Sequence, residues 1–168
     1  MKQVGDRYQV GLLWKNPDIE FPDNRYMAER CLCSTEKVLK RDNAFTEKYK
    51  EIIDGYVAKG HARKLTPDES AIPTKKQWFL PHHAVLNPNK PGKVRMVMDV
   101  KAKHNNASLN DKLLVGPDLL NNLCGVLLRF REERIPLLAD IESMFHQCQI
   151  IEEDQPALRF LWRNLQTK

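Results

Sequence analysis

The chain has 168 residues, of which 42% are hydrophobic and 29% are charged, so it is long enough for one domain with a core but too short for two large ones. This composition excludes a disordered chain, and no apolar run approaches the roughly 20 residues that a membrane-spanning helix needs. The formal charge of +5 permits a polyanionic partner but does not by itself indicate one.

The N-terminus and the cysteines bear on the compartment. Residues Met1 to Asp6 lack the apolar region of a secretion signal, so we expect an intracellular protein, cytoplasmic or nuclear and not secreted. The four cysteines do not form the two spaced pairs of a zinc site; they are Cys31, Cys33, Cys124 and Cys148. We therefore expect reduced thiols that are buried rather than bound to metal.

The N-terminal part predicts an extended arm followed by a helical hairpin. The apolar stretch Tyr8 to Trp14 favours an edge strand or arm. A charged helix is predicted from Arg25 to Lys40, with Asp23 or Asn24 as its N-cap. The apolar stripe expected along this helix contains Met27, Cys31, Val38 and Leu39. A second helix is predicted from Ala44 to Ala58, ending at Gly60, with an apolar side made of Phe45, Tyr49, Ile52, Ile53 and Tyr56.

The middle of the chain predicts a basic β-hairpin. Residues 64–75 are polar and indicate a loop, and two strands are predicted after it, Trp78 to Leu86 and Val94 to Val100, joined by a turn rich in Pro, Asn and Gly. The basic cluster on this hairpin consists of Lys90, Lys93, Arg95, Lys101 and Lys103. Alternate spacing places Lys93 and Arg95 on one face, which either clamps a triphosphate or nucleic-acid backbone or is simply solvated.

The last third predicts one helix and several strand pieces. Gly116 and Pro117 indicate the start of a helix, whose apolar side would contain Leu119, Leu120, Leu123, Leu127 and Phe130. A short apolar strand is predicted from Ile135 to Ala139, directly before Asp140, and further strand pieces are predicted at 148–151 and 158–162.

A few side chains have the character of site residues. A charge at the end of a buried strand is costly unless it is paired, so Asp140 either coordinates a metal or caps the following turn. Phe145 either forms the floor of a sugar pocket or belongs to the core. His82 and His83 are adjacent and point to opposite faces of a strand, so they cannot hold one metal together, and we interpret them as structural.

Several sequence blocks, in their order, resemble the start of the reverse transcriptase in the Pol polyprotein of BEL/Pao-type LTR retrotransposons. They are Tyr8–Trp14 (YQVGLLW), Trp78–Arg95 (WFLPHHAVLNPNKPGKVR), Ser108–Asp111 (SLND), Gly116–Leu120 (GPDLL), Leu127–Arg131 (LLRFR) and Ala139–Gln147 (ADIESMFHQ). The blocks span nearly the whole chain, and their order makes the resemblance more specific than any single block.

The resemblance implies an α+β fold, namely part of the fingers and palm of a right-hand polymerase preceded by a helical hairpin. Residues 1–63 would form the N-terminal arm and the helical hairpin that leads into the fingers. Residues 64–134 would form the fingers with the basic β-hairpin, and residues 135–168 the first strands of a truncated palm.

The resemblance also implies roles for individual residues. Asp140 would be the first catalytic carboxylate and bind two Mg²⁺ ions, and the backbone carbonyl of Ile141 would help to hold one of them. Phe145 would be the steric gate that excludes ribonucleotides.

The basic hairpin would contact the substrate. Arg95, together with Lys93 or Lys90, would bind the triphosphate of the incoming deoxynucleotide. The partners of the complete enzyme would be this nucleotide and an RNA or DNA template-primer, without a membrane.

The sequence departs from the family in one respect that bears on activity. It contains no Tyr-x-Asp-Asp segment, which supplies the other catalytic carboxylates of such polymerases. We therefore expect an RNA-directed DNA polymerase fragment that is inactive alone. The alternatives are a non-catalytic nucleic-acid-binding module and a translated retroelement relic. Because palm strands would lack their neighbours, we also expect self-association through an exposed edge.

Overall fold

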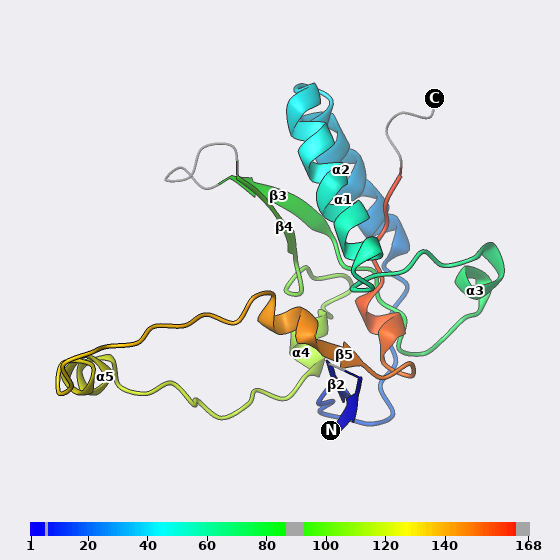
Figure 1. Ribbon diagram of the computed structural model, residues 1–168. Coiled ribbons are helices and arrows are strands. Elements are labelled where there is room, and N and C mark those ends of the chain that lie inside the picture. The colour runs from blue at the N-terminus through cyan, green and yellow to red at the C-terminus, as the bar shows by residue number, and fades with distance from the viewer. Residues whose placement is uncertain (6, 87–92, 164–168) are drawn as a thin grey trace.

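The computed structural model describes residues 1–5, 7–86 and 93–163 and shows a mixed α and β structure (Figure 1). The strands are β1 (Lys2–Val4), β2 (Arg7–Val10), β3 (His82–Leu86), β4 (Val94–Met98) and β5 (Cys148–Ile150). The helices are α1 (Arg25–Leu39), α2 (Asn43–Ala58), α3 (Pro67–Ala71), α4 (Leu109–Lys112) and α5 (Leu123–Arg129), and the 3₁₀ turns are η1 (Met144–Gln147) and η2 (Gln155–Leu158). The assignment of this fold to the fingers and palm of a polymerase stays a prediction.

The strands form two small sheets. In the first, β2 lies between β1 and β5, antiparallel to β1 and parallel to β5, with Tyr8 opposite Cys148. The second is the antiparallel β3–β4 hairpin, with His82 opposite Met98 and Leu86 opposite Val94. The predicted hairpin and the strand predicted at 148–151 are confirmed, whereas only the beginning of the predicted arm is a strand.

The helical hairpin is confirmed, and both helices agree with their predicted bounds to within one residue. Asp42 begins α2, because its Oδ1 accepts hydrogen bonds from the backbone N–H groups of Ala44 (2.9 Å) and Phe45 (3.2 Å). The helix ends at Ala58, and Gly60, just after the C-cap Lys59, has a φ of +66°, the left-handed conformation that glycine tolerates.

The buried side of α1 differs from the predicted stripe, because Val38 is exposed while the charged Glu36 is buried and paired with Arg163. Asn24 makes no capping hydrogen bond. Its buried amide instead donates to the carbonyl oxygen of Phe79 (2.7 Å) and accepts from the N–H of the same residue (2.9 Å). This pairing ties the start of α1 to the segment before β3.

Two apolar clusters form the core. The first surrounds the fully buried Trp78, whose ring centroid lies 5.0 Å from that of Phe21; its other buried members are Ile19, Leu80, Leu109 and Ala157. The second contains Leu39, Tyr49 and Ile53 and lies between the helical hairpin and the inner face of β4. The first cluster therefore joins segments from the arm, from the loop before β3 and from η2.

Asp154 fastens the N-terminal arm to the C-terminal part of the chain. Its buried carboxylate accepts hydrogen bonds from the backbone N–H of Leu12 (2.8 Å), the indole N–H of Trp14 (2.8 Å) and the ammonium group of Lys76 (2.7 Å). Burial alone raises the pKa of Asp154, but these hydrogen bonds outweigh it, so its pKa lies below the ordinary 3.8.

Some predicted elements are wrong in their details. The predicted loop at 64–75 contains the short helix α3, which begins with a capping box formed by Thr66 and Glu69. The strand predicted from Trp78 starts only at His82, because Trp78 and its neighbours are core residues without a continuous strand partner. Residues 158–162 do not form the predicted strand; they make an isolated bridge between Arg159 and Phe79.

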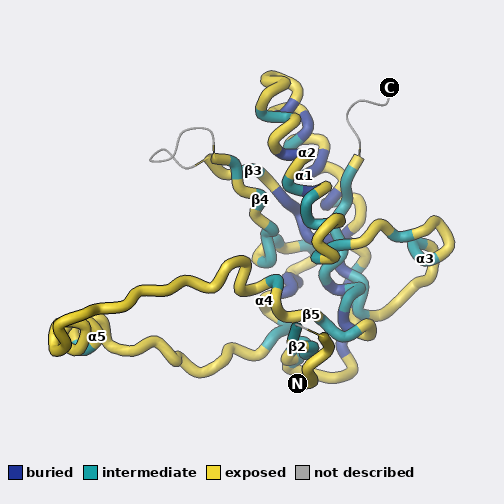
Figure 2. Tube along the Cα trace, viewed as in Figure 1, coloured by how far each residue is buried: buried dark blue, intermediate teal, exposed yellow. Residues whose placement is uncertain are grey.

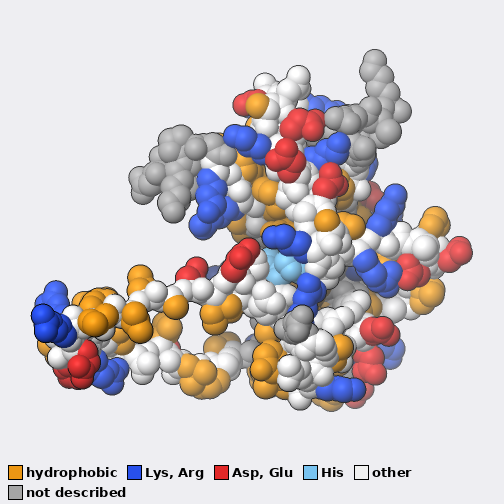
Figure 3. All heavy atoms as spheres, in the orientation of Figure 1, with side chains coloured by type: hydrophobic (Ala, Val, Ile, Leu, Met, Phe, Trp, Pro, Cys, Tyr) orange, Lys and Arg blue, Asp and Glu red, His pale blue; other side chains and the backbone are white. Residues whose placement is uncertain are grey.

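Residues 114–143, which we call the projecting segment, leave the body of the molecule, carry α5 near the tip and return to η1 (Figure 1). Almost all of this segment is exposed (Figure 2), and apolar side chains line it while charged ones gather at its tip (Figure 3). The helix expected after Gly116 begins only at Leu123, with Asn122 as its cap. The strand predicted from Ile135 to Ala139 is not formed.

The missing strand has a physical cause. A β-strand is held in place by hydrogen bonds between its backbone N–H and C=O groups and those of a neighbouring strand. In the described part of the chain, residues 135–139 have no such neighbour. Their apolar side chains remain in solvent; Leu137 and Leu138 are 87% and 92% exposed.

Two further expectations concern membranes and thiols. Across the described ranges, no helix combines the length and the apolar character needed to cross a bilayer. The four cysteine thiols are free, as expected. Cys33, Cys124 and Cys148 are exposed, however, so the prediction of buried thiols was wrong for these three.

Candidate functional site

The β3–β4 hairpin presents two of the predicted basic residues, Lys93 and Arg95, to solvent. Along β4 the side chains alternate, so that Val94, Met96 and Met98 turn inward while Arg95 is exposed. Lys93, directly before the strand, is also exposed, and Val85 lies opposite Arg95 on β3. The alternation therefore gives Arg95 the outward position that the sequence predicts. Lys90 lies outside the described residues.

His82 fixes the base of this hairpin to α2 and to the C-terminal segment. Its Nε2 lies 2.7 Å from the carbonyl oxygen of Leu161, and its Nδ1 lies 2.7 Å from the hydroxyl of Tyr49. Because a carbonyl only accepts, Nε2 carries the proton and Nδ1 accepts from Tyr49. Burial lowers the pKa of His82 below its ordinary 6.5, which keeps this neutral form at pH 7. The interpretation of His82 as structural is confirmed.

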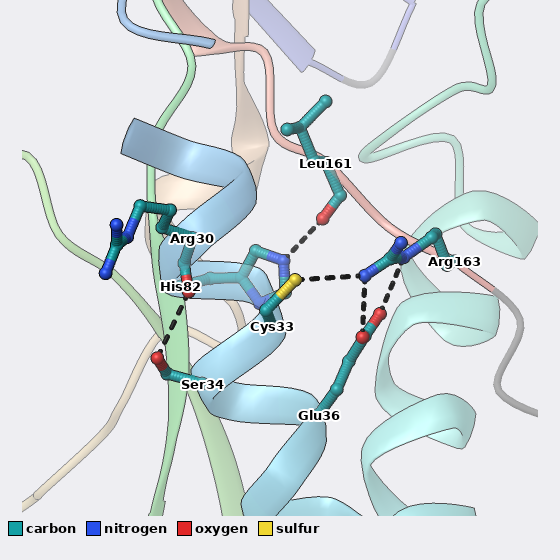
Figure 4. A network of polar contacts seen from close by, with 7 residues as sticks. All are labelled: Arg30, Cys33, Ser34, Glu36, His82, Leu161 and Arg163. Carbon is teal, nitrogen blue, oxygen red and sulfur yellow. Dashed lines mark hydrogen bonds and ion pairs between the residues drawn. The ribbon is translucent and has the colours of Figure 1, made fainter. Parts of the chain in front are cut away.

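A second connection beside the hairpin base comes from Arg163. Its guanidinium group donates to both carboxylate oxygens of Glu36, at 2.9 and 2.7 Å, and also reaches the sulfur of Cys33 at 3.3 Å (Figure 4). The hydrogen bonds that Arg163 donates to Glu36 raise the pKa of Arg163 above its ordinary value. With His82 and Leu161 in the same view, the figure shows α1, β3 and residues 161–163 tied into one network.

A cleft of about 400 Å³ lies where α1 meets the base of the hairpin. Its walls include Arg30 and Cys31 of α1, His83 of β3, and Asp99, which follows β4. Burial, and then the carboxylate of Asp99, raise the pKa of the Cys31 thiol, so this cysteine is a poor nucleophile at neutral pH. The walls of the cleft include charges of both signs, from Arg30 and Asp99.

Asp140 lies on the returning limb of the projecting segment and is exposed. It follows no strand, so the prediction that it ends a buried strand was wrong, and it has neither a hydrogen-bond nor an ion-pair partner among the described residues. Ile141 is 65% exposed and Phe145, in η1, is 83% exposed. Phe145 is therefore not a core residue in this structure.

The basic and acidic parts of the expected site are not joined. No hydrogen bond or ion pair links Asp140, Ile141 or Phe145 to Lys93 or Arg95 within the part of the chain that the structure describes. The structure thus presents the hairpin as a formed surface, whereas the acidic segment is extended and separate.

The donors for magnesium are few. Mg²⁺ takes six oxygen ligands, of which the Asp140 carboxylate and the Ile141 carbonyl could supply two. Over residues 1–5, 7–86 and 93–163 no three His, Cys, Asp or Glu side chains are grouped so that they could hold a metal ion. These residues alone do not fit a pair of ions, and no catalytic step can be built from them.

Comparison with known proteins leaves the family open. No protein-family model, curated protein or solved structure matches the chain. The resemblance to BEL/Pao reverse transcriptases therefore stays a prediction that depends on the sequence blocks.

Two polar clusters were missed by the reasoning from sequence. One is the set of bonds around Asp154, and the other is a stack of His61 on His146. The partners of Asp154 lie between 78 and 142 positions away in the chain. No local pattern connects residues so far apart, so the sequence held no signal for either cluster.

Proposed function

We propose that this chain forms the fingers and the start of the palm of a BEL/Pao-type retrotransposon reverse transcriptase. The observation that supports this most is the basic hairpin. Arg95 and Lys93 are exposed beside each other on its outer side, while His82 and the second core cluster hold its inner side on the helical hairpin. A rigid support with exposed cations suits binding of phosphates.

In the complete enzyme, which would be intracellular, the hairpin contacts the triphosphate of a deoxynucleotide paired to an RNA or DNA template. Two Mg²⁺ ions are proposed to be held by Asp140, by the carbonyl of Ile141 and by a Tyr-x-Asp-Asp segment that these 168 residues do not contain. They would supply the charge neutralisation of nucleotidyl transfer. Phe145 is proposed to lie below the sugar.

The projecting segment is consistent with a role as part of a larger protein. It exposes a series of large apolar side chains, among them Leu119, Leu120, Leu137 and Leu138, each at least 83% exposed. Soluble proteins rarely leave such extended apolar surface uncovered. We propose that further polymerase residues cover it, and that without them the chain self-associates there.

A second candidate function is a non-catalytic nucleic-acid-binding module. It is favoured by the contrast between the two parts of the expected site, because the cationic hairpin is formed while the carboxylate of Asp140 has no hydrogen-bond or ion-pair partner among the described residues. Such a module would bind primer-template without extending it.

Both candidates predict that the hairpin binds nucleic acid. Lys93→Ala combined with Arg95→Ala should weaken binding of the chain to a primer-template duplex about tenfold or more, because two contacts with phosphates are lost. The binding constant should also depend less steeply on salt, by about 0.9 in the slope of log K against log salt for each lost contact. Fluorescence anisotropy at several salt concentrations would measure this.

The matched control removes the same charge elsewhere. Lys64 and Lys75 are exposed and flank α3, which lies on the other side of the molecule from the hairpin (Figure 1). Lys64→Ala with Lys75→Ala should leave most of the affinity and of the salt slope. Equal losses for the two double variants would contradict a specific role of the hairpin.

Primer extension separates the two candidates. The 168-residue chain should not extend a primer, whereas a longer product of the same reading frame that includes a Tyr-x-Asp-Asp segment should extend it with Mg²⁺. Asp140→Asn in that longer protein should reduce the rate at least about a hundredfold if the carboxylate binds the ions, while Glu142→Gln serves as the nearby control. A longer protein that binds but never extends would support the binding module.

A further inference from the structure

Three aromatic rings join the end of α2 to η1. The imidazole rings of His61 and His146 are stacked, with centroids 4.5 Å apart and planes inclined by 16°. The ring of Tyr56 packs on both, at 5.0 Å from His146 and 6.2 Å from His61. His61 directly follows Gly60, so the turn that ends α2 holds it in place, and its backbone N–H donates to the carbonyl oxygen of Tyr56 at 2.8 Å.

The surroundings of this stack disfavour positive charge on His61. Its Nδ1 atom is buried and has no hydrogen-bond partner among the described residues. The guanidinium group of Arg7, on β2, is close by, because it donates to the carbonyl oxygens of Lys59 (2.6 Å) and Gly60 (3.1 Å). The ionisable groups that face His61 are thus the bases Arg7, Lys59 and His146 and the phenol of Tyr56. None of these can compensate an imidazolium charge at pH 7.

We propose that the His61–His146 stack is a pH-sensitive latch that holds η1, and the segment leading into it, against the end of α2. Neutral imidazoles stack favourably, whereas two imidazolium rings face to face at this separation repel each other and are also repelled by Arg7. Protonation would therefore separate η1 from α2. The β3–β4 hairpin is not part of the stack, and α2 contributes only Tyr56 to it, so both would remain in place.

The direction of the pH dependence follows from linkage. Burial, and then the charges of His146, Arg7 and Lys59, lower the pKa of His61 below its ordinary 6.5 while the latch is closed. The released state, in which His61 is solvated, takes up a proton more readily. The closed latch is therefore at full stability above pH 6.5 and loses stability as the pH falls below this value.

The latch bears on the placement of η1, which joins the projecting segment to β5. η1 contains Phe145, and β5 directly after it contributes the parallel pairing with β2. Release would free η1, where the returning limb of the projecting segment rejoins the body, from its contact with α2. The inference goes beyond the proposed function and does not depend on it, because its test measures structure and needs no nucleic acid.

Hydrogen exchange of the full 168-residue chain tests the latch. After correction for intrinsic exchange rates, the opening of residues 144–151 should increase by up to about fivefold between pH 6.5 and pH 5.5, because a solvated His61 with the ordinary pKa of 6.5 is already half protonated at the start of this range. Residues 45–53 of α2 serve as the internal reference, because they report on general loss of stability, including that from His82. An increase of several-fold confined to 144–151 supports the latch; an equal increase in both regions, or none, overturns it.

Two variants make the test specific. His61→Phe with His146→Phe keeps aromatic rings in contact but removes both titrating groups, so the opening of 144–151 should no longer change with pH. His83→Gln removes an exposed histidine on β3 and should keep the wild-type response. A pH response that persists in the double Phe variant would overturn the latch. If this variant does not fold, the comparison of the two regions in the wild-type chain still decides.

Discussion

Replacing Trp78 by alanine is expected to lower the free energy of unfolding by about 3–5 kcal/mol, as for other large aromatic residues in a core. Trp78 is completely buried, its ring is tilted against that of Phe21, and the cluster around it joins the arm, the loop before β3 and η2. Because a domain of this kind is stabilised by only about 5–15 kcal/mol, this loss is a large fraction of the total, and Trp78→Ala should unfold at a clearly lower urea concentration than the wild-type chain. Urea denaturation followed by circular dichroism measures the change.

Two controls sharpen this prediction. Trp78→Phe should lower the free energy of unfolding clearly less than Trp78→Ala does, because phenylalanine keeps an aromatic ring in the core. The substitution also removes the buried indole N–H, which has no hydrogen-bond partner within the described residues. Leu120→Ala, at a position that is 89% exposed, should leave stability almost unchanged. If Trp78→Ala were as stable as Leu120→Ala, the first cluster would not be the core of the molecule.

Asp154→Ala should destabilise the chain by a similar amount, about 3–5 kcal/mol, because it removes one partner of a buried ion pair. The substitution leaves the ammonium group of Lys76, whose side chain is only 25% exposed, and two N–H groups of the arm without their acceptor. Asp154→Asn should cost less, since the amide keeps one accepting oxygen but not the charge. The exposed neighbour Glu153 provides the control, and Glu153→Ala should be nearly neutral.

Asp154 also predicts how stability depends on acid. Its pKa in the folded chain lies below the ordinary 3.8, so its stabilising contribution is complete above pH 3.8 and is lost as the pH falls through the lower value of the folded state. Between pH 5 and pH 2 the wild-type chain should therefore lose more stability than Asp154→Ala does. Parallel curves for the two proteins over this range would show that the carboxylate does not hold the arm.

Trp78 and Asp154, whose substitution should destabilise the chain most, lie away from the proposed phosphate-binding hairpin. A loss of binding must therefore be compared with the stability of each variant. The hairpin that carries Arg95 rests on the second cluster, whereas Trp78 and Asp154 belong to the region where the arm meets the C-terminal part. Loss of binding in a Trp78 or Asp154 variant would reflect unfolding. Loss of binding in the Lys93 and Arg95 variant, with unchanged stability, would report on the hairpin surface itself.

The sequence by itself determined the elements whose signals are local. Apolar spacing predicts both helices of the helical hairpin, because a helix satisfies its own backbone within each turn. Alternation along β4 likewise places Arg95 outside and Met96 inside, since neighbouring side chains of a strand always point to opposite faces.

Only the tertiary structure decided the features that depend on partners distant in the chain. Residues 135–139 have the composition of a strand, yet they remain extended and exposed because no neighbouring strand pairs with them. Asp154 became an anchor, and His61 and His146 a stack, because folding brought together residues that no local pattern connects. A hydrogen bond or a ring contact depends on where both partners lie, and the position of the second partner is a property of the whole fold.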